Sequence, residues 1–122
     1  MIKNWEFNIY DEILANELKN FIPKEVLDIH FHPYRLKDLN LCENFVIKNG
    51  PENADMNEVR RCMNKFFGDN KFIGGLILGY PTAACDIDAV NNYVLEQVDR
   101  ESESKGSICI SPNYPISKVL HY

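Results

Sequence analysis

The sequence predicts an α/β fold with a parallel sheet, because helical and extended apolar patterns alternate along its 122 residues. Apolar residues recur at helical spacing in residues 12 to 22, 55 to 67 and 87 to 101. Extended apolar runs occupy residues 25 to 32, 71 to 81 and 107 to 111. Neighbouring parallel strands need a long connection that is usually helical. We therefore expect a leading N-terminal helix and about three βα units in one domain, residues 1–122.

Capping residues mark the ends of the expected helices. Asp11 precedes the first helix, and Asp86 precedes the third. Asp55 and Glu58 form a D-x-x-E pattern at the start of the second helix, which Gly68 closes. Short side chains with an oxygen acceptor satisfy the free N–H groups of a first helical turn. Each helix therefore has a predicted start.

The strand expected at residues 71 to 81 carries Gly74, Gly75 and Gly79 within a continuous apolar run. Such a run predicts a strand covered on both faces, and glycine suits a close approach of another backbone. The glycines do not have the spacing of a phosphate-binding loop. We therefore assign them a packing role.

Charge and hydropathy exclude several classes of partner. The formal net charge is −5 without a Lys/Arg cluster, which argues against nucleic acid or an anionic membrane surface. No run of eighteen apolar residues and no secretory signal is present, so we expect a cytoplasmic protein. The four cysteines lack metal-site or disulfide-scaffold spacing and are expected as free thiols.

The segment "VLDIHFHPY", residues 26 to 34, contains the main candidates for a functional site. Side chains alternate along a strand, so Asp28, His30 and His32 share one face. The opposite face is apolar, and if helices cover it, the polar face points inward. Residues i and i+2 lie roughly 6.5 Å apart along a strand, close enough for two imidazoles to bind one ion. We predict that His30 and His32 bind a divalent metal, zinc before manganese, and that Asp28 supports them.

A histidine pair on a strand can also be solvated or hydrogen-bonded without a metal. Its position favours the metal, because open α/β sheets and β/α barrels place active sites at the carboxyl ends of their strands. A catalytic zinc normally takes three protein ligands, so at least one more must come from elsewhere.

"LDIHFHP", preceded by a short helix and a proline, resembles the D-x-H-x-H opening of the amidohydrolase superfamily. The stretch "NNYVLEQVDRESESKGSICISPN" is similar to the second helix and third strand of its amidohydrolase-related branch. The resemblance covers nearly the whole chain and implies a partial (β/α)₈ TIM barrel in which His30 and His32 are two metal ligands. It implies a metal-dependent hydrolase, with lactonases and decarboxylases in the same branch, acting on a small-molecule substrate.

The further ligands of that family come from later strands and have no counterpart here. A whole barrel of this kind takes about 250 residues. The resemblance therefore implies an N-terminal portion that is inactive alone and that self-associates or pairs with a missing C-terminal barrel segment. A nuclease-like or phosphoesterase barrel is a related alternative that the lack of basic clusters disfavours. A non-catalytic α/β metal-binding or oligomerising module is the alternative from another class.

Other residues are also candidates for a site. The polar stretch between the first strand and Ala54 is long for such a connection, and its Tyr34 and Arg35 are expected to face a substrate or else to lie on the loop surface. Asp86 and Asp88 could form a carboxylate pair, but capping explains them better. Catalytic residues are not assigned.

Overall fold

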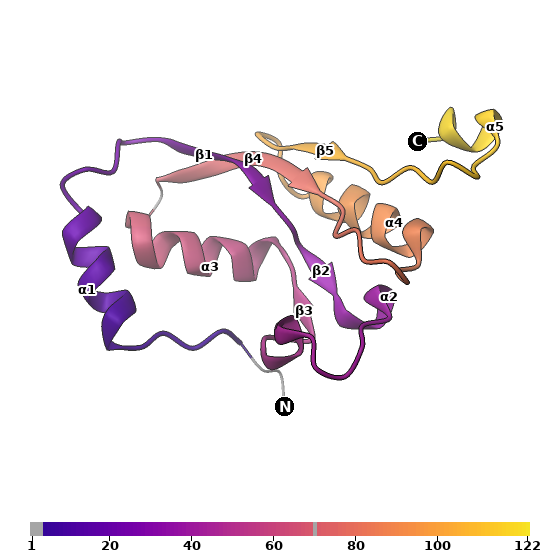
Figure 1. Ribbon diagram of the computed structural model, residues 1–122. Coiled ribbons are helices and arrows are strands. Elements are labelled where there is room, and N and C mark those ends of the chain that lie inside the picture. Colours follow the sequence, from indigo (N-terminus) through magenta and orange to yellow (C-terminus); the bar gives the residue numbers. More distant parts are fainter. Residues whose placement is uncertain (1–3, 70) are drawn as a thin grey trace.

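The computed structural model describes residues 4–69 and 71–122 and has a parallel sheet with helices packed beneath it (Figure 1). In chain order its elements are α1 (Ile9–Leu18), β1 (Val26–Phe31), β2 (Tyr34–Arg35), α2 (Leu36–Leu39), η1 (Val46–Asn49), β3 (Asn53–Ala54), α3 (Met56–Phe67), β4 (Phe72–Leu78), α4 (Ile87–Val98), β5 (Lys105–Ser107) and α5 (Ile116–Val119). Within those two ranges, every helix is too short or too polar to cross a membrane.

The main sheet has the order β1-β4-β5, with both pairs parallel. Helix α3 connects β1 to β4, and α4 connects β4 to β5. Figure 1 places α3 and α4 beneath the same sheet. The predicted α/β class with a parallel sheet and helical crossovers is therefore confirmed.

The pairing of β1 with β4 depends on glycine. A Cβ atom on Gly75 would lie 1.7 Å from the carbonyl oxygen of Asp28, which no side chain could tolerate. Gly74 has a φ of 144°, in the region that side chains disfavour. The predicted close approach of two backbones is confirmed at these two residues.

A core forms between the sheet and the two helices. Phe31 and Phe72 contact each other edge to face, with ring centroids 5.9 Å apart. The buried members of this core are Phe31, Met56, Val59, Phe72, Ile77 and Val94. Residues from β1, β4, α3 and α4 thus share one apolar layer, and its burial drives their association.

The apolar face expected on β1 is covered only at its end. Phe31 is 6% exposed, whereas Leu27 is 57% and Ile29 77% exposed. The reason is topological, because β1 lies at the edge of the sheet and the core beneath β4 reaches only its last residue. The premise that helices cover this whole face was wrong.

The leading helix begins earlier than the sequence pattern predicts. Asn8 is the N-cap of α1, and its side chain accepts from the backbone of Tyr10. Asp11, expected as the cap, instead lies in the first turn and accepts from the backbone of Asn8, which completes a capping box. No residue of α1 is buried, so its apolar stripe is only partly covered where it packs on α3.

The other caps match the prediction more closely. Asp55 accepts from the backbone of Glu58 at the start of α3, and Asp86 accepts from the backbone of Ala89 at the start of α4. Gly68 ends α3 with a φ of 91°. The Glu58 carboxylate does not return to the cap and bonds Trp5 and Arg61 instead.

The third strand, β5 (Lys105–Ser107), shares only Ser107 with the predicted residues 107 to 111. β5 ends at Ser107, because the side chain of the buried Asn91 forms hydrogen bonds with the backbone that follows. Its amide accepts from the Cys109 N–H at 2.8 Å and donates to the Cys109 carbonyl at 2.9 Å. These bonds satisfy the backbone of Cys109 without a strand neighbour.

The long polar stretch after β1 is partly ordered into its own small sheet. β2 and β3 pair antiparallel, with Tyr34 opposite Ala54. The C-terminal α5 is held by Asp88, which accepts from Tyr114, Lys118 and Tyr122. These bonds, first that from Lys118, lower the pKa of Asp88 to about 2. Asp88 is therefore an anchor and does not pair with Asp86.

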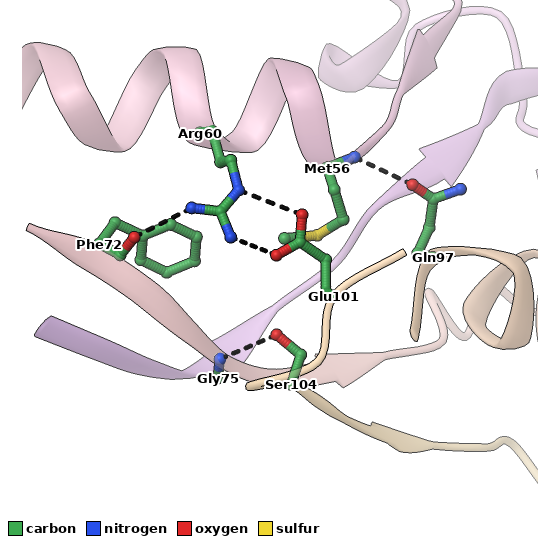
Figure 2. Close-up of polar contacts among 7 residues, drawn as sticks. All are labelled: Met56, Arg60, Phe72, Gly75, Gln97, Glu101 and Ser104. Carbon is green, nitrogen blue, oxygen red and sulfur yellow. Dashed lines mark hydrogen bonds and ion pairs between the residues drawn. The ribbon is translucent and has the colours of Figure 1, made fainter. Parts of the chain in front are cut away.

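Polar side chains join the two crossover helices (Figure 2). Arg60 of α3 forms a two-point ion pair with Glu101 and donates to the carbonyl of Phe72 at 3.0 Å. Gln97 accepts from the first N–H of α3, at Met56. Ser104 accepts from the N–H of Gly75 in β4 at 3.1 Å. The end of α4 and the segment after it are thereby tied to both α3 and the sheet.

We predict that Glu101→Gln destabilises the fold by about 1 to 3 kcal/mol, because it removes the charge from a mostly buried partner of Arg60. Chemical denaturation measures the change in the free energy of unfolding. Glu103→Gln, two residues away and exposed, is the matched control and should change stability by less than about 0.5 kcal/mol. Equal stability of the two variants would contradict the role given to the ion pair.

Candidate metal site

His30 and His32 converge at the carboxyl end of β1. Their Nε2 atoms lie 3.1 Å apart, and their ring centroids are 4.9 Å apart at an interplanar angle of 75°. His30 is exposed and His32 is half-buried, so the polar face does not point into the interior as the sequence predicted for a helix-covered strand. The i, i+2 spacing on a strand places both rings on one side, as the sequence predicts.

The ring of His32 is oriented by β4. Its Nδ1 lies 3.2 Å from the carbonyl oxygen of Leu78 and 3.1 Å from that of Gly79. Carbonyl oxygens only accept, so Nδ1 carries the proton and the Nε2 of the neutral ring carries a lone pair. A metal-binding histidine needs this tautomer when Nε2 is the ligand atom.

Asp28 supports His30 through the backbone. Its Oδ1 accepts from the His30 N–H at 2.9 Å. This bond fixes the strand between the two residues, where the pairing of β1 with β4 is irregular. Asp28 thus positions the peptide that carries the His30 ring.

Two imidazoles alone do not make a complete metal site. Among residues 4–69 and 71–122, no group of three or more His, Cys, Asp or Glu side chains could hold a metal ion. His121 lies in the C-terminal turn, where its ring contacts Tyr122. Within the described residues, the structure thus brings no third such side chain to the two histidines.

Tyr34 and Arg35 lie in different surroundings. Tyr34 is 3% exposed and packs between Trp5 and Tyr80, so it is not loop surface. Burial first, then the charge of Glu58, raises the pKa of Tyr34 to about 12, which keeps its hydroxyl protonated at neutral pH.

Arg35 turns away from the histidines. Its guanidinium bonds Asp38 at 2.6 Å and lies 4.5 Å from the ring centre of Tyr93. It lines a cleft of about 720 Å³ with Arg61 and Arg100, to which neither histidine contributes. The structure therefore does not bring Arg35 together with His30 and His32.

A row of aromatic rings leads away from the histidines. Tyr80 contacts His32 with ring centroids 5.2 Å apart, Tyr34 contacts Tyr80 at 6.3 Å, and Trp5 contacts Tyr34 at 6.2 Å. Tyr80 lies two residues after the end of β4, so the rule that places sites at carboxyl ends of strands would have identified it. The sequence offers no comparable signal for Trp5.

Trp5 is fixed by an ion pair of α3. The backbone N–H of Trp5 donates to Glu58 at 3.0 Å, and its backbone carbonyl accepts from Arg61 at 2.5 Å. The side chains of Glu58 and Arg61 also bond each other. Arg61, and to a smaller extent the Trp5 N–H, lowers the pKa of Glu58 against the opposing effect of burial. Glu58 and Arg61 thus hold the segment before α1 in place.

Two of the four cysteines, Cys62 and Cys109, are poorly suited to act as nucleophiles. All four are free thiols, as predicted. Burial raises the pKa of Cys62 to about 11 and also raises the pKa of Cys109. Thiols with raised pKa values are poor nucleophiles at neutral pH.

We predict that acidification releases Trp5. Because the folded pKa of Glu58 is lowered, its stabilising contribution is complete above the unfolded value of about 4.3 and is lost as the pH falls through the lower folded value. The emission of Trp5, the single tryptophan, should shift to longer wavelength, and Glu58→Gln should show this shift at pH 7. Glu52→Gln, which is exposed, is the control. Identical spectra for Glu58→Gln and the wild type would contradict the anchor.

Comparison with protein-family models, with curated proteins and with solved structures finds no match to this chain. The case for a function therefore depends on the geometry of the described residues.

Proposed function

We propose that the protein is a metal-dependent hydrolase of the amidohydrolase type, in which His30 and His32 are two ligands of a divalent ion. The observation that carries this proposal is the 3.1 Å approach of the two Nε2 atoms. Two nitrogens that each lie about 2.0 to 2.1 Å from a tetrahedral zinc ion are roughly 3.3 Å apart. The pair thus has nearly the separation that zinc needs, and manganese is the second choice.

The protonation of His32 supports the same proposal. Its Nδ1 donates to two carbonyls of the strand end, so its Nε2 lone pair faces His30. Either the Nε2 of His30 donates a proton to it or both lone pairs bind a common cation. The exposure of His30 leaves the second arrangement accessible to an ion from solution.

The residues of this chain hold and orient the ion. Asp28 fixes the peptide of His30, and the carbonyls of Leu78 and Gly79 fix the ring of His32. When bound, such an ion supplies a water whose pKa is lowered to about 7, which makes hydroxide available for attack on a C–O or C–N bond. Lactone hydrolysis and decarboxylation belong to the same proposal.

The partial (β/α)₈ barrel is part of this proposal. Three parallel strands with crossover helices beneath them are consistent with three consecutive units of such a barrel. The exposed Leu27 and Ile29 on β1 are consistent with an edge that further chain covers. In that arrangement the remaining ligands would come from a second copy or from further barrel segments.

A second candidate is a non-catalytic α/β metal-binding or oligomerising module. The observation that favours it is the absence of a third ligand within the described ranges. Turnover separates the two, because a zinc-loaded assembly that hydrolyses an ester supports the enzyme, and one that binds zinc without turnover supports the module.

We predict that His30→Ala combined with His32→Ala weakens zinc binding at least tenfold, because it removes both nitrogen ligands. Zinc bound per chain, measured by elemental analysis after equilibrium dialysis, gives the result. His121→Ala is the matched control and should bind zinc as the wild type does. Equal zinc contents in the double variant and the wild type would exclude the site.

A further inference from the structure

A cleft of about 580 Å³ lies beside the aromatic row. Trp5 and Tyr80 provide its aromatic walls, and Val46 and Ile47 of η1 add apolar surface. Aromatic walls with a few polar groups are typical of sites for small organic molecules. Because Tyr80 follows β4, the cleft opens at the same end of the sheet as the histidines.

Two hydrogen-bond donors lie beside Gly50, which lines this cleft. A Cβ atom on Gly50 would lie 2.7 Å from Nε1 of Trp5 and 3.1 Å from the hydroxyl of Tyr34. The Tyr34 hydroxyl is buried and has no partner among the groups that the structure describes. Tyr34 does not belong to the lining of the cleft, so the indole N–H of Trp5, which does line it, is the ring donor offered to an acceptor oxygen of a ligand.

Hydrogen bonds and packing hold the walls of the cleft in place. The backbone of Trp5 is held on both sides by Glu58 and Arg61 of α3. Tyr80 packs against the apolar cluster formed by Tyr34, Leu39, Ala54 and Val90. A ring that binds between Trp5 and Tyr80 therefore meets surfaces that need little reorganisation, which favours affinity.

The charge of the cleft restricts its ligand. Glu6 is the single charged residue in its described lining, and the remaining polar groups include the neutral amides of Asn4 and Asn49. A carboxylate ligand would be repelled by Glu6 and would meet no cation in the described lining of the cleft. An uncharged compound with a carbonyl acceptor meets neither obstacle.

We infer that this cleft binds the ring of an uncharged aromatic amide or ester, whose carbonyl accepts from Trp5 Nε1. The role of that ligand as a substrate rests on the proposed function, because one ring, Tyr80, separates the cleft from His32. Hydrolysis would convert such a substrate into an acid, which Glu6 would disfavour in the cleft.

Benzamide and benzoate test this inference, because they share a ring and differ in charge. The chain has one tryptophan, so ¹⁵N-labelled protein gives one indole N–H cross-peak. We expect benzamide to shift that peak saturably at millimolar concentration and benzoate to bind at least fivefold more weakly. Titration in the presence of EDTA keeps the result independent of any metal.

Two variants sharpen the test. Gly50→Ala puts a methyl group against both donors and should weaken benzamide at least tenfold. Tyr34→Phe removes a hydroxyl that has no described partner and does not line the cleft, so it should retain the fold and bind benzamide as the wild type does. Tyr10→Phe, at a tyrosine that is 78% exposed, is the control and should bind normally.

The outcomes separate the two proposals. No saturable shift in the wild type, or equal binding of benzamide and benzoate, would overturn the cleft assignment whatever the histidines bind. Saturable benzamide binding with the expected variant effects would support the cleft even if zinc binding failed, and in that case only the hydrolase proposal would fall.

Discussion

The close parallel pairing of β1 with β4 is the constraint on which the rest of the structure depends. It exists because Gly75 leaves room for the Asp28 carbonyl, where a Cβ atom would be only 1.7 Å away. The pairing brings the end of β1 to the end of β4, where the carbonyls of Leu78 and Gly79 accept from His32. The close packing at Gly75 thereby helps to determine which nitrogen of the His32 ring carries the proton, that is, its tautomer.

The helices beneath the sheet hold this arrangement from one side. Phe31 enters the core formed with α3 and α4, which fixes the last residue of β1 directly between the two histidines in sequence. Figure 2 shows how the two helices are tied, with Arg60 bridging Glu101 and the carbonyl of Phe72. α3 also fixes Trp5 through Glu58, so one helix supports both the sheet and the neighbouring cleft.

Local patterns in the sequence predicted the features that depend on local physics. Alternation along β1 placed His30 and His32 on one side, and short acidic residues marked the starts of α3 and α4. The glycines predicted the close approach of two strands. These predictions needed only strand periodicity and the hydrogen-bond needs of helix ends.

Features that depend on distant partners were not predictable in the same way. The third strand ended early because Asn91, buried in α4, takes the backbone of Cys109. Leu27 and Ile29 are exposed because β1 is an edge strand, and sequence periodicity does not reveal strand order. The position of Trp5 follows from an ion pair more than fifty residues away.

The central claim is that β4 holds His32 as the Nδ1-protonated tautomer, with its Nε2 lone pair directed at His30. Long-range ¹H–¹⁵N correlation spectra of the imidazole nitrogens test it directly in the metal-free protein. The account predicts a protonated Nδ1 and an unprotonated Nε2 for His32 at a pH where the ring is neutral. A neutral His32 protonated at Nε2 would contradict it, because that nitrogen would then be unable to bind a metal.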